Sequence, residues 1–353
     1  MRTKLRHRSG LAALVLAVAL VAAACGGNDD DSGGGSGSEE LSGSIKISGS
    51  STVEPITSLA AEKFREQNAN VNISVDGPGT GDGFELFCNG ETDVSDASRA
   101  IKEEEAAACK GKNIEFIELQ IGIDGLAVIT SSQNSSVSGL NFADLYALIG
   151  PESQGFKNWA DASKLAAELG SKSKLPSAPL SITAPGEESG TYDSFVELAL
   201  VPEADKRIEA KKITEEQAST TRKDYQASPN DNVIIEGVSG NASSLGWVGF
   251  AFADENKDKV KLLPIAKEAG ADFIAPTPET IADNSYPLSR PLFIYVNKAK
   301  LDASPALKAF IDYYLSDEGL ANVTEADYVA LNDEQKAKTK STWDARTVGT
   351  QQS

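Results

Sequence analysis

The sequence is poor in the side chains that most often carry catalysis or hold metal ions. Its 353 residues include one histidine and three cysteines. The histidine is His7, which lies in an N-terminal segment that we expect to be cleaved, so the mature chain would have none. This excludes a Ser-His-Asp or Cys-His mechanism and any histidine-ligated metal. No other metal-ligand cluster is evident, and we expect neither a metal nor a cofactor.

Basic residues are outnumbered as well. The chain has 33 Lys and Arg residues against 52 Asp and Glu residues, which gives a formal net charge of −19. This excess of negative charge argues against nucleic acid, and against an anionic membrane surface, as a partner. The length allows one to three domains with a sizeable core.

Residues 1–24 have the features of a bacterial lipoprotein signal peptide. The first eight residues carry four basic side chains, and the apolar run at 11–24 suits a signal sequence but is short for a membrane span. Small residues directly before Cys25 resemble a lipobox, although the usual Leu is replaced by Ala22. The alternative is ordinary signal cleavage with an incidental cysteine. Removing the four basic residues takes the formal charge from −19 to −23.

Cys25 would then become a lipidated N-terminus. Its acyl chains, palmitate among them, would hold the protein on the extracytoplasmic face of the cell membrane. Residues 25–43 are rich in Gly, Ser and Asp, which predicts a flexible tether between the lipid and the fold.

The two other cysteines are Cys88 and Cys109. Outside the cytoplasm we expect them to form a disulfide, which in the chain-entropy description stabilises the fold by roughly 3 kcal/mol. The alternative is two separate buried thiols.

Three stretches repeat one pattern, in which a short strand runs into a hydroxyl- or glycine-rich turn and then into a helix. Ser51 and Thr52 lie in the first turn, Thr80 in the second, and Ser189 to Thr191 in the third. The first N–H groups of a helix lack partners and carry partial positive charge, so such turns can bind an oxyanion. Each turn could instead be an ordinary N-cap. The recurrence favours an anion site.

The alternation of strands and helices predicts an α/β fold with mainly parallel sheets. Ligands in such sheets bind at the carboxyl ends of the strands, where all three turns lie. We also expect strands over 121–130, 232–238, 245–251 and 291–296, and a single helix over 306–323.

With these residues in view, the chain resembles the phosphate-binding lipoproteins of bacterial ABC phosphate importers, the PstS family. The resemblance implies a type II periplasmic-binding-protein fold, in which two α/β lobes close on a ligand in the interlobe cleft. Lobe 1 would comprise residues 44–121 and 289–353, and lobe 2 residues 122–288. The matching stretches are 48–55 (SGSSTVEP), 77–84 (GPGTGDGF), 93–99 (DVSDASR), 189–195 (SGTYDSF) and 286–296 (YPLSRPLFIYV).

The resemblance also implies a set of phosphate-binding residues. The family usually has an arginine shortly before the third turn, but this sequence has none at 185–188. Arg99 is the expected replacement, and Arg290 is a distant second that would only brace the hinge. The full expected set is Ser51, Thr52, Thr80, Asp96, Arg99, Ser189, Gly190 and Thr191.

Asp96 matches the buried carboxylate of the family and suggests how the anion is selected. An ionised carboxylate can only accept hydrogen bonds, so it needs a proton from the ligand. Phosphate still carries a proton near neutral pH, whereas sulfate does not, and an unsatisfied buried polar group discriminates strongly. The alternative is that Asp96 merely pairs with Arg99.

These observations predict a lipid-anchored receptor that is not an enzyme. It would bind inorganic phosphate as a monomer and deliver it to the membrane permease subunits of an ABC importer. One alternative is a receptor for another oxyanion, such as sulfate, molybdate or arsenate. Another is a phosphate-ester hydrolase, although neither Ser51 nor Ser189 has an evident general base. A third is an adhesion protein, which would leave the three turns without a role.

Overall fold

The computed structural model describes residues 40–351. The expected signal peptide, Cys25 and most of the expected tether lie outside the described residues. Within 40–351, no helix combines the length and the apolar character that crossing a membrane requires.

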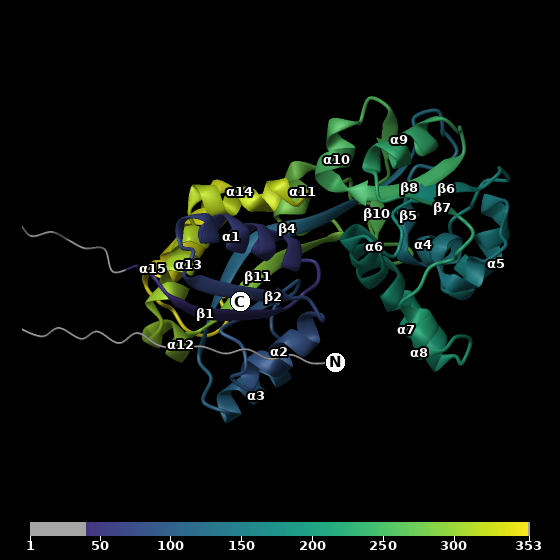
Figure 1. Cartoon of the computed structure of the whole chain (residues 1–353). Helices are drawn as coiled ribbons and strands as arrows, with labels where there is room; N and C mark the ends of the chain where they lie inside the picture. The colour runs from purple at the N-terminus through teal and green to yellow at the C-terminus, as the bar shows by residue number, and fades with distance from the viewer. Residues whose placement is uncertain (1–39, 352–353) are drawn as a thin grey trace, which may run out of the picture. The chain divides into compact units, whose positions relative to one another are not determined.

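Two long strands, β4 (Phe116–Ser131) and β11 (Ser289–Asn297), form the centre of the fold. They pair antiparallel along the whole of β11, with Ser289 opposite Gly125 and Asn297 opposite Phe116. All but one residue of β4 is buried, as expected for a nearly continuous apolar run covered on both faces. Because β4 pairs with β11 at one end and with β8 at the other, it connects two groups of elements, which we call the two lobes (Figure 1).

The first lobe surrounds the N-terminal strands. Alternate residues of β11 face opposite sides of the sheet: Leu292 and Ile294 join a core under α1 and α13, whereas Phe293 and Tyr295 join a smaller core under α2 and α3. Helices therefore cover both faces of this part of the sheet (Figure 1). The elements are β1 (Gly43–Gly49), α1 (Glu54–Gln67), β2 (Val71–Asp76), α2 (Thr80–Cys88), β3 (Val94–Ala97), α3 (Glu103–Gly111), α12 (Lys298–Ala303), α13 (Pro305–Tyr314), α14 (Asp317–Glu325) and α15 (Asp333–Asp344).

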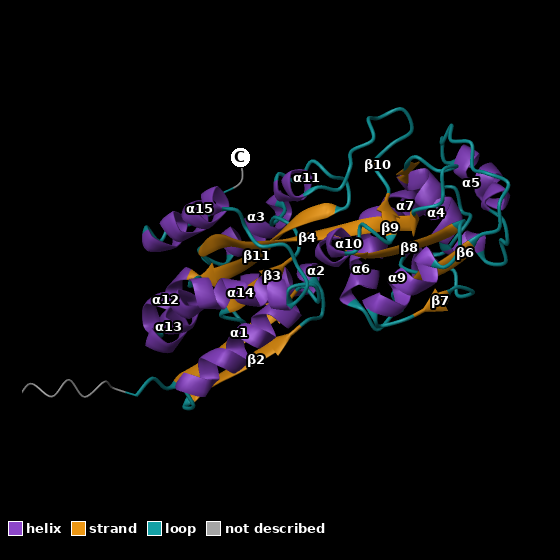
Figure 2. Ribbon diagram, turned by 90° about the horizontal axis from the view of Figure 1, so that it is seen from above, coloured by secondary structure: helices purple, strands orange, loops and turns teal. Residues whose placement is uncertain are grey.

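The second lobe surrounds the other end of β4 and has its own core, which includes Trp159, Phe195 and Trp247. Figure 2 shows α6, α9 and α10 around strands β6 and β8. Its elements are β5 (Leu140–Asn141), α4 (Phe142–Ile149), η1 (Pro151–Ser153), η2 (Trp159–Ala162), α5 (Ser163–Glu168), β6 (Ser181–Ala184), α6 (Gly190–Phe195), the π-helical η3 (Val196–Leu200), α7 (Val201–Glu209), α8 (Glu215–Ala218), β7 (Gln226–Ala227), α9 (Asp231–Ser239), β8 (Ser244–Gly249), α10 (Phe250–Glu255), β9 (Val260–Leu262), β10 (Ile265–Ala266) and α11 (Pro278–Ala282).

The main sheet is mixed rather than mainly parallel. Its strands follow the order β2-β1-β3-β11-β4-β8-β6-β7, and β9 also pairs with β4. The pairings that involve neither β4 nor β11 are parallel, whereas the four that involve β4 or β11 are antiparallel. The α/β class and the two-lobe architecture expected from the sequence are confirmed. The expected lobe boundaries at 121/122 and 288/289 stay a prediction.

Two expected elements are wrong. Residues 232–238 form most of helix α9 instead of a strand, because the Asn230 side chain accepts a hydrogen bond from the Asn232 N–H and starts a helix. The single helix expected over 306–323 is divided into α13 and α14. The Ser316 hydroxyl accepts from the N–H of Gly319 and starts a second helix there.

The expected disulfide between Cys88 and Cys109 is confirmed, and it joins the end of α2 to α3. The strands β4 and β11, which join the two lobes, form the hinge, and a short segment after α14 pairs with β4 beside them. There, the N–H of Val329 donates to the carbonyl of Ile123 on β4, and the N–H of Ile123 donates back to Val329, at 2.9 Å each.

Candidate anion-binding site

The first expected turn, residues 50–53, connects β1 to α1. The Ser50 N–H donates to the carbonyl of Asp96 at 2.9 Å, which holds the turn against the end of β3. No side chain caps α1, whose N-cap residue is Val53. The ordinary N-cap interpretation therefore does not describe Ser51 or Thr52. The hydroxyl of Thr52 instead accepts a hydrogen bond from Arg290 at 3.0 Å.

The second expected turn lies beside the first because of close backbone packing. A Cβ on Gly83 would lie 2.4 Å from the Cα of Gly49, so only glycine lets α2 approach the end of β1 this closely. The Thr80 hydroxyl lies 3.1 Å from the Ser98 hydroxyl and accepts from the Ser98 N–H at 3.2 Å. Thr80 is thus fixed next to the segment that carries Asp96.

Asp96 lies on β3 and is fully buried, and neither of its carboxylate oxygens has a hydrogen-bond partner among residues 40–351. It shares a face of β3 with Val94, whose side chain packs in the core under α1. Burial raises the pKa of Asp96 to about 7, the negative charge of Glu54 adds to the shift, and the nearby Thr57 hydroxyl opposes it. A buried acceptor without a partner is costly, which marks this carboxylate as a candidate for a ligand proton.

The third expected turn begins α6 in the second lobe. Ser189 is an N-cap, since its hydroxyl oxygen accepts from the Thr191 N–H at 3.2 Å. The hydroxyl of Ser189 can still donate one hydrogen bond. A Cβ on Gly190 would lie 3.5 Å from the phenol oxygen of Tyr328, so the third turn lies against the segment that follows α14.

Arg290 connects the first turn to the second lobe. Its side chain is 11% exposed, and its Nε donates to the Asp124 carboxylate at 3.0 Å. Its Nη2 donates to the hydroxyls of Thr52 and Ser194, at 3.0 and 2.9 Å, and its Nη1 to Glu197. The two carboxylates raise the pKa of Arg290 against the lowering effect of burial. A permanent positive charge therefore lies where elements of both lobes meet.

Arg99, the expected cationic contact, is placed differently. Both Nη atoms donate to the Glu105 carboxylate, at 2.8 and 2.7 Å, and the guanidinium lies 5.5 Å from the centre of the Phe84 ring. The alternative pairing of Asp96 with Arg99 is also absent among the described ion pairs, since the partner of Arg99 is Glu105. The structure thus joins Thr52 to Arg290, and it gives Arg99 a carboxylate partner on α3.

The sequence interpretation missed Ser194, Glu197 and Tyr328. Ser194 lies one helical turn after Thr191, so helical spacing could have placed it on the site side of α6. Tyr328 follows Asp327, a non-glycine residue with a φ of 65°, and its position depends on the pairing of Val329 with β4. No local motif identifies such a residue.

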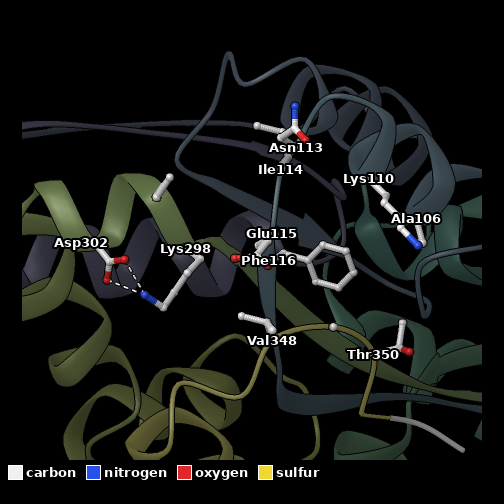
Figure 3. A pocket seen from close by; sticks show the side chains of 12 residues that line it. Ala106, Lys110, Asn113, Ile114, Glu115, Phe116, Lys298, Asp302, Val348 and Thr350 are labelled. Atoms are coloured by element: carbon white, nitrogen blue, oxygen red, sulfur yellow. Dashed lines mark hydrogen bonds and ion pairs between the residues drawn. The ribbon is translucent and has the colours of Figure 1, made fainter.

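A separate hollow of about 740 Å³ lies between α3, α12 and the C-terminal segment (Figure 3). Ile114, Phe116 and Val348 line it together with Lys298, which pairs with Asp302. None of the residues expected to bind the anion contributes to it, and it is not part of this candidate site. Among residues 40–351, no group of three or more acidic, histidine or cysteine side chains is arranged to hold a metal ion.

Strands β4 and β11 join the two lobes, and Arg290 on β11 contacts both the turn before α1 and helix α6. This arrangement is typical of a binding protein that holds its ligand between two lobes. A family model described as a PBP superfamily domain matches residues 34–318. The protein SphX of Synechococcus elongatus is 36% identical over 273 residues, which are 77% of this chain and 73% of that protein. The phosphate-binding protein PstS of Staphylococcus aureus is 36% identical over 297 residues, 84% of this chain and 80% of that one.

Solved structures agree with these relatives. The crystal structure of a possible phosphate binding protein from Planctomyces limnophilus has a TM-score of 0.76 at 34% identity, covering 87% of this chain and 99% of that chain. The structure of PstS from Borrelia burgdorferi, at 23% identity and a TM-score of 0.54, shares the fold. The chain therefore belongs to the PBP superfamily and, within it, to the PstS family.

The raised pKa of Asp96 predicts how stability depends on pH. Because its pKa is higher in the folded protein than in the unfolded chain, protonated Asp96 stabilises the fold fully below about pH 4. That contribution is lost as the pH rises to about 7. The side chain at this position cannot ionise in the variant Asp96→Asn. The melting temperature of wild type minus that of Asp96→Asn should therefore decrease as the pH is raised from about 4 to about 7. Thermal unfolding in phosphate-free buffer measures this difference.

Asp82→Asn is the matched control for this experiment, since Asp82 is exposed on α2. The melting temperature of Asp82→Asn should change with pH in the same way as that of the wild type. Parallel profiles for Asp96→Asn as well would show that Asp96 does not titrate in this window.

Proposed function

We propose that the protein is an extracytoplasmic receptor that binds one inorganic phosphate ion between its lobes. The observation that carries the proposal is the Arg290 guanidinium, which bonds to Thr52 of the first turn and to Ser194 of α6. Guanidinium, hydroxyls and backbone N–H groups are the donors that a dehydrated oxyanion requires. The named PstS relatives, which are phosphate-binding proteins, support the same ligand. They are binding proteins, in agreement with the expectation that the chain is not an enzyme.

The proposed ligand set keeps Ser51, Thr52, Thr80 and Asp96 from the first lobe. The second lobe would contribute Ser189, Gly190 and Thr191, with the hydroxyl of Tyr328 beside them. Arg290 takes the cationic role in place of Arg99, because Arg290 bonds to Thr52 of the first turn and Ser194 of α6, whereas both Nη atoms of Arg99 bond to Glu105. Ionised Asp96 would accept the proton that phosphate carries and sulfate lacks.

The protein would release phosphate to the permease subunits of an ABC importer, working as a monomer. We also propose that Cys25 carries the lipid that anchors it to the membrane. The length of the glycine- and serine-rich segment after Cys25 supports this arrangement, since it would separate the anchor from the fold.

Calorimetric titration of the soluble protein lacking residues 1–25 tests the ligand. Phosphate should bind one to one, whereas sulfate should bind much more weakly, and arsenate measures selectivity among protonated oxyanions. Phosphate at about a hundred times its Kd should stabilise the fold by about 2.7 kcal/mol. Bound anion must first be removed by unfolding and refolding. No heat and no rise in melting temperature at millimolar phosphate would exclude phosphate as the ligand.

The choice between the two arginines is tested by a matched pair of substitutions. Arg290→Lys keeps a charge for Asp124 but loses the planar fork of donors, so phosphate affinity should fall on the order of tenfold or more. Arg99→Lys should leave the Kd within about twofold, since Arg99 bonds to Glu105 rather than to the turns. The reverse result would return the cationic role to Arg99.

The anchor is tested independently of the ligand. Cys25→Ala should move the protein from the membrane fraction to the soluble fraction, with phosphate affinity unchanged. Fractionation followed by titration measures both. A variant that remains in the membrane fraction would contradict lipidation at Cys25.

A further inference from the structure

Arg290 has one buried and one exposed carboxylate partner. Asp124 lies directly opposite it on β4, and its side chain is 2% exposed. Glu197 lies in the π-helical η3 between α6 and α7, and its side chain is 55% exposed. Removing Asp124 from the guanidinium would leave a buried charge without a partner, whereas Glu197 can move into water. Glu197 is therefore the exchangeable partner.

A count of donors shows why this matters for an anion. A guanidinium has five N–H groups. One is bonded to Asp124, two to Thr52 and Ser194, and one to Glu197, which leaves one N–H that the described contacts do not use. The unused N–H and the N–H bonded to Glu197 are both on Nη1, so an oxyanion that binds this nitrogen lies beside the Glu197 carboxylate and competes with it.

Charge favours Glu197 as the partner that leaves. Thr52 and Ser194 are neutral and can turn their hydroxyl groups toward an anion as donors. Glu197 carries negative charge and would repel an anion bound to the same guanidinium. The π-helical geometry that positions it is rare and often occurs at functional sites.

The surroundings of Glu197 offer it a second position. It lines a hollow of about 590 Å³ on the second lobe, together with Lys206 and Lys267. Lys206 lies one turn from Glu203 and pairs with it at 2.7 Å, so its ammonium group is held at this hollow. Glu203 and Glu268 line the same hollow and balance its two lysines, so a displaced Glu197 side chain would move mainly into water.

We infer that Glu197 competes with the bound anion for Arg290 and thereby sets the affinity of the site. This inference rests on the proposed phosphate-binding function and adds to it a residue that weakens binding. Glu197 is a positioning residue, because it acts on the ligand through the guanidinium. Removing its charge strengthens binding, in contrast to the loss expected for a residue that supports the site.

Glu197→Gln tests the inference, because glutamine keeps the size of the side chain and removes its charge. Phosphate should bind about fivefold to tenfold more tightly, which is below the usual range for a hydrogen bond to a charged group because this contact is partly exposed. Glu209→Gln is the matched control, since it makes the same change on an exposed position of α7 and should leave the Kd unchanged. An unchanged or weaker affinity in Glu197→Gln overturns the inference.

A double-mutant cycle separates competition from a general structural effect. In the Arg290→Lys background, Glu197→Gln should give a clearly smaller gain in affinity, because the fork that both anions use is gone. An equal gain in both backgrounds would show that Glu197 acts independently of Arg290, and would also overturn the inference. Absence of phosphate binding by the wild-type protein would instead refute the proposed function, so the two failures are distinguishable.

Discussion

The guanidinium of Arg290 bonds at once to the hinge strand β4, to the first turn of one lobe and to α6 of the other. A charge that is this deeply buried needs a buried counter-charge, so the stability of the site depends on Asp124 staying in place. The planar fork also fixes the directions in which those partners must lie. The pairing of Arg290 with Asp124 across two adjacent strands thus fixes the position of the guanidinium that contacts both lobes.

Negative charge dominates the sequence, yet the proposed ligand is an anion. The two facts are compatible, because hydrogen-bond donors in a water-excluded site attract the ligand much more strongly than distant, screened carboxylates repel it. The same reasoning makes nearby carboxylates important. Asp96 is buried with no hydrogen-bond partner among residues 40–351, and Glu197 is exposed and bonded to Arg290, so for the proposed site their individual positions matter more than the formal charge of −19.

Local sequence patterns located the three turns, but they did not predict the contacts of the two arginines. Each strand–turn–helix unit lies within about twenty consecutive residues, so periodicity and hydroxyl content identify it. Arg99 is three residues from Asp96 in the sequence, but α3 offers it Glu105. Arg290 reaches Thr52 only because β11 pairs with β4 in one particular register. Strand register between distant segments cannot be read from one local stretch.

The errors in secondary structure have a different cause, which is local capping. Apolar residues at 234, 235 and 238 suit a buried strand or a helix, and the Asn230 cap decides between them. At Ser316 a capping hydroxyl ends one helix and begins another inside an otherwise continuous apolar pattern. In both cases a single polar side chain overrides a pattern of apolar spacing.

The position of β11 has a consequence for the order in which the protein assembles. β11 is inserted between β3 and β4, although it follows β3 by nearly two hundred residues in the chain. The elements of the second lobe lie almost entirely between β4 and β11 in the chain. The second lobe can therefore complete its core before β11 pairs with β3 and β4. Closing the first lobe requires pairing of distant segments, which is intrinsically slow. Arg290 lies on β11, which pairs late. A chain that ends before β11 would contain all three turns but would lack the arginine that contacts both lobes.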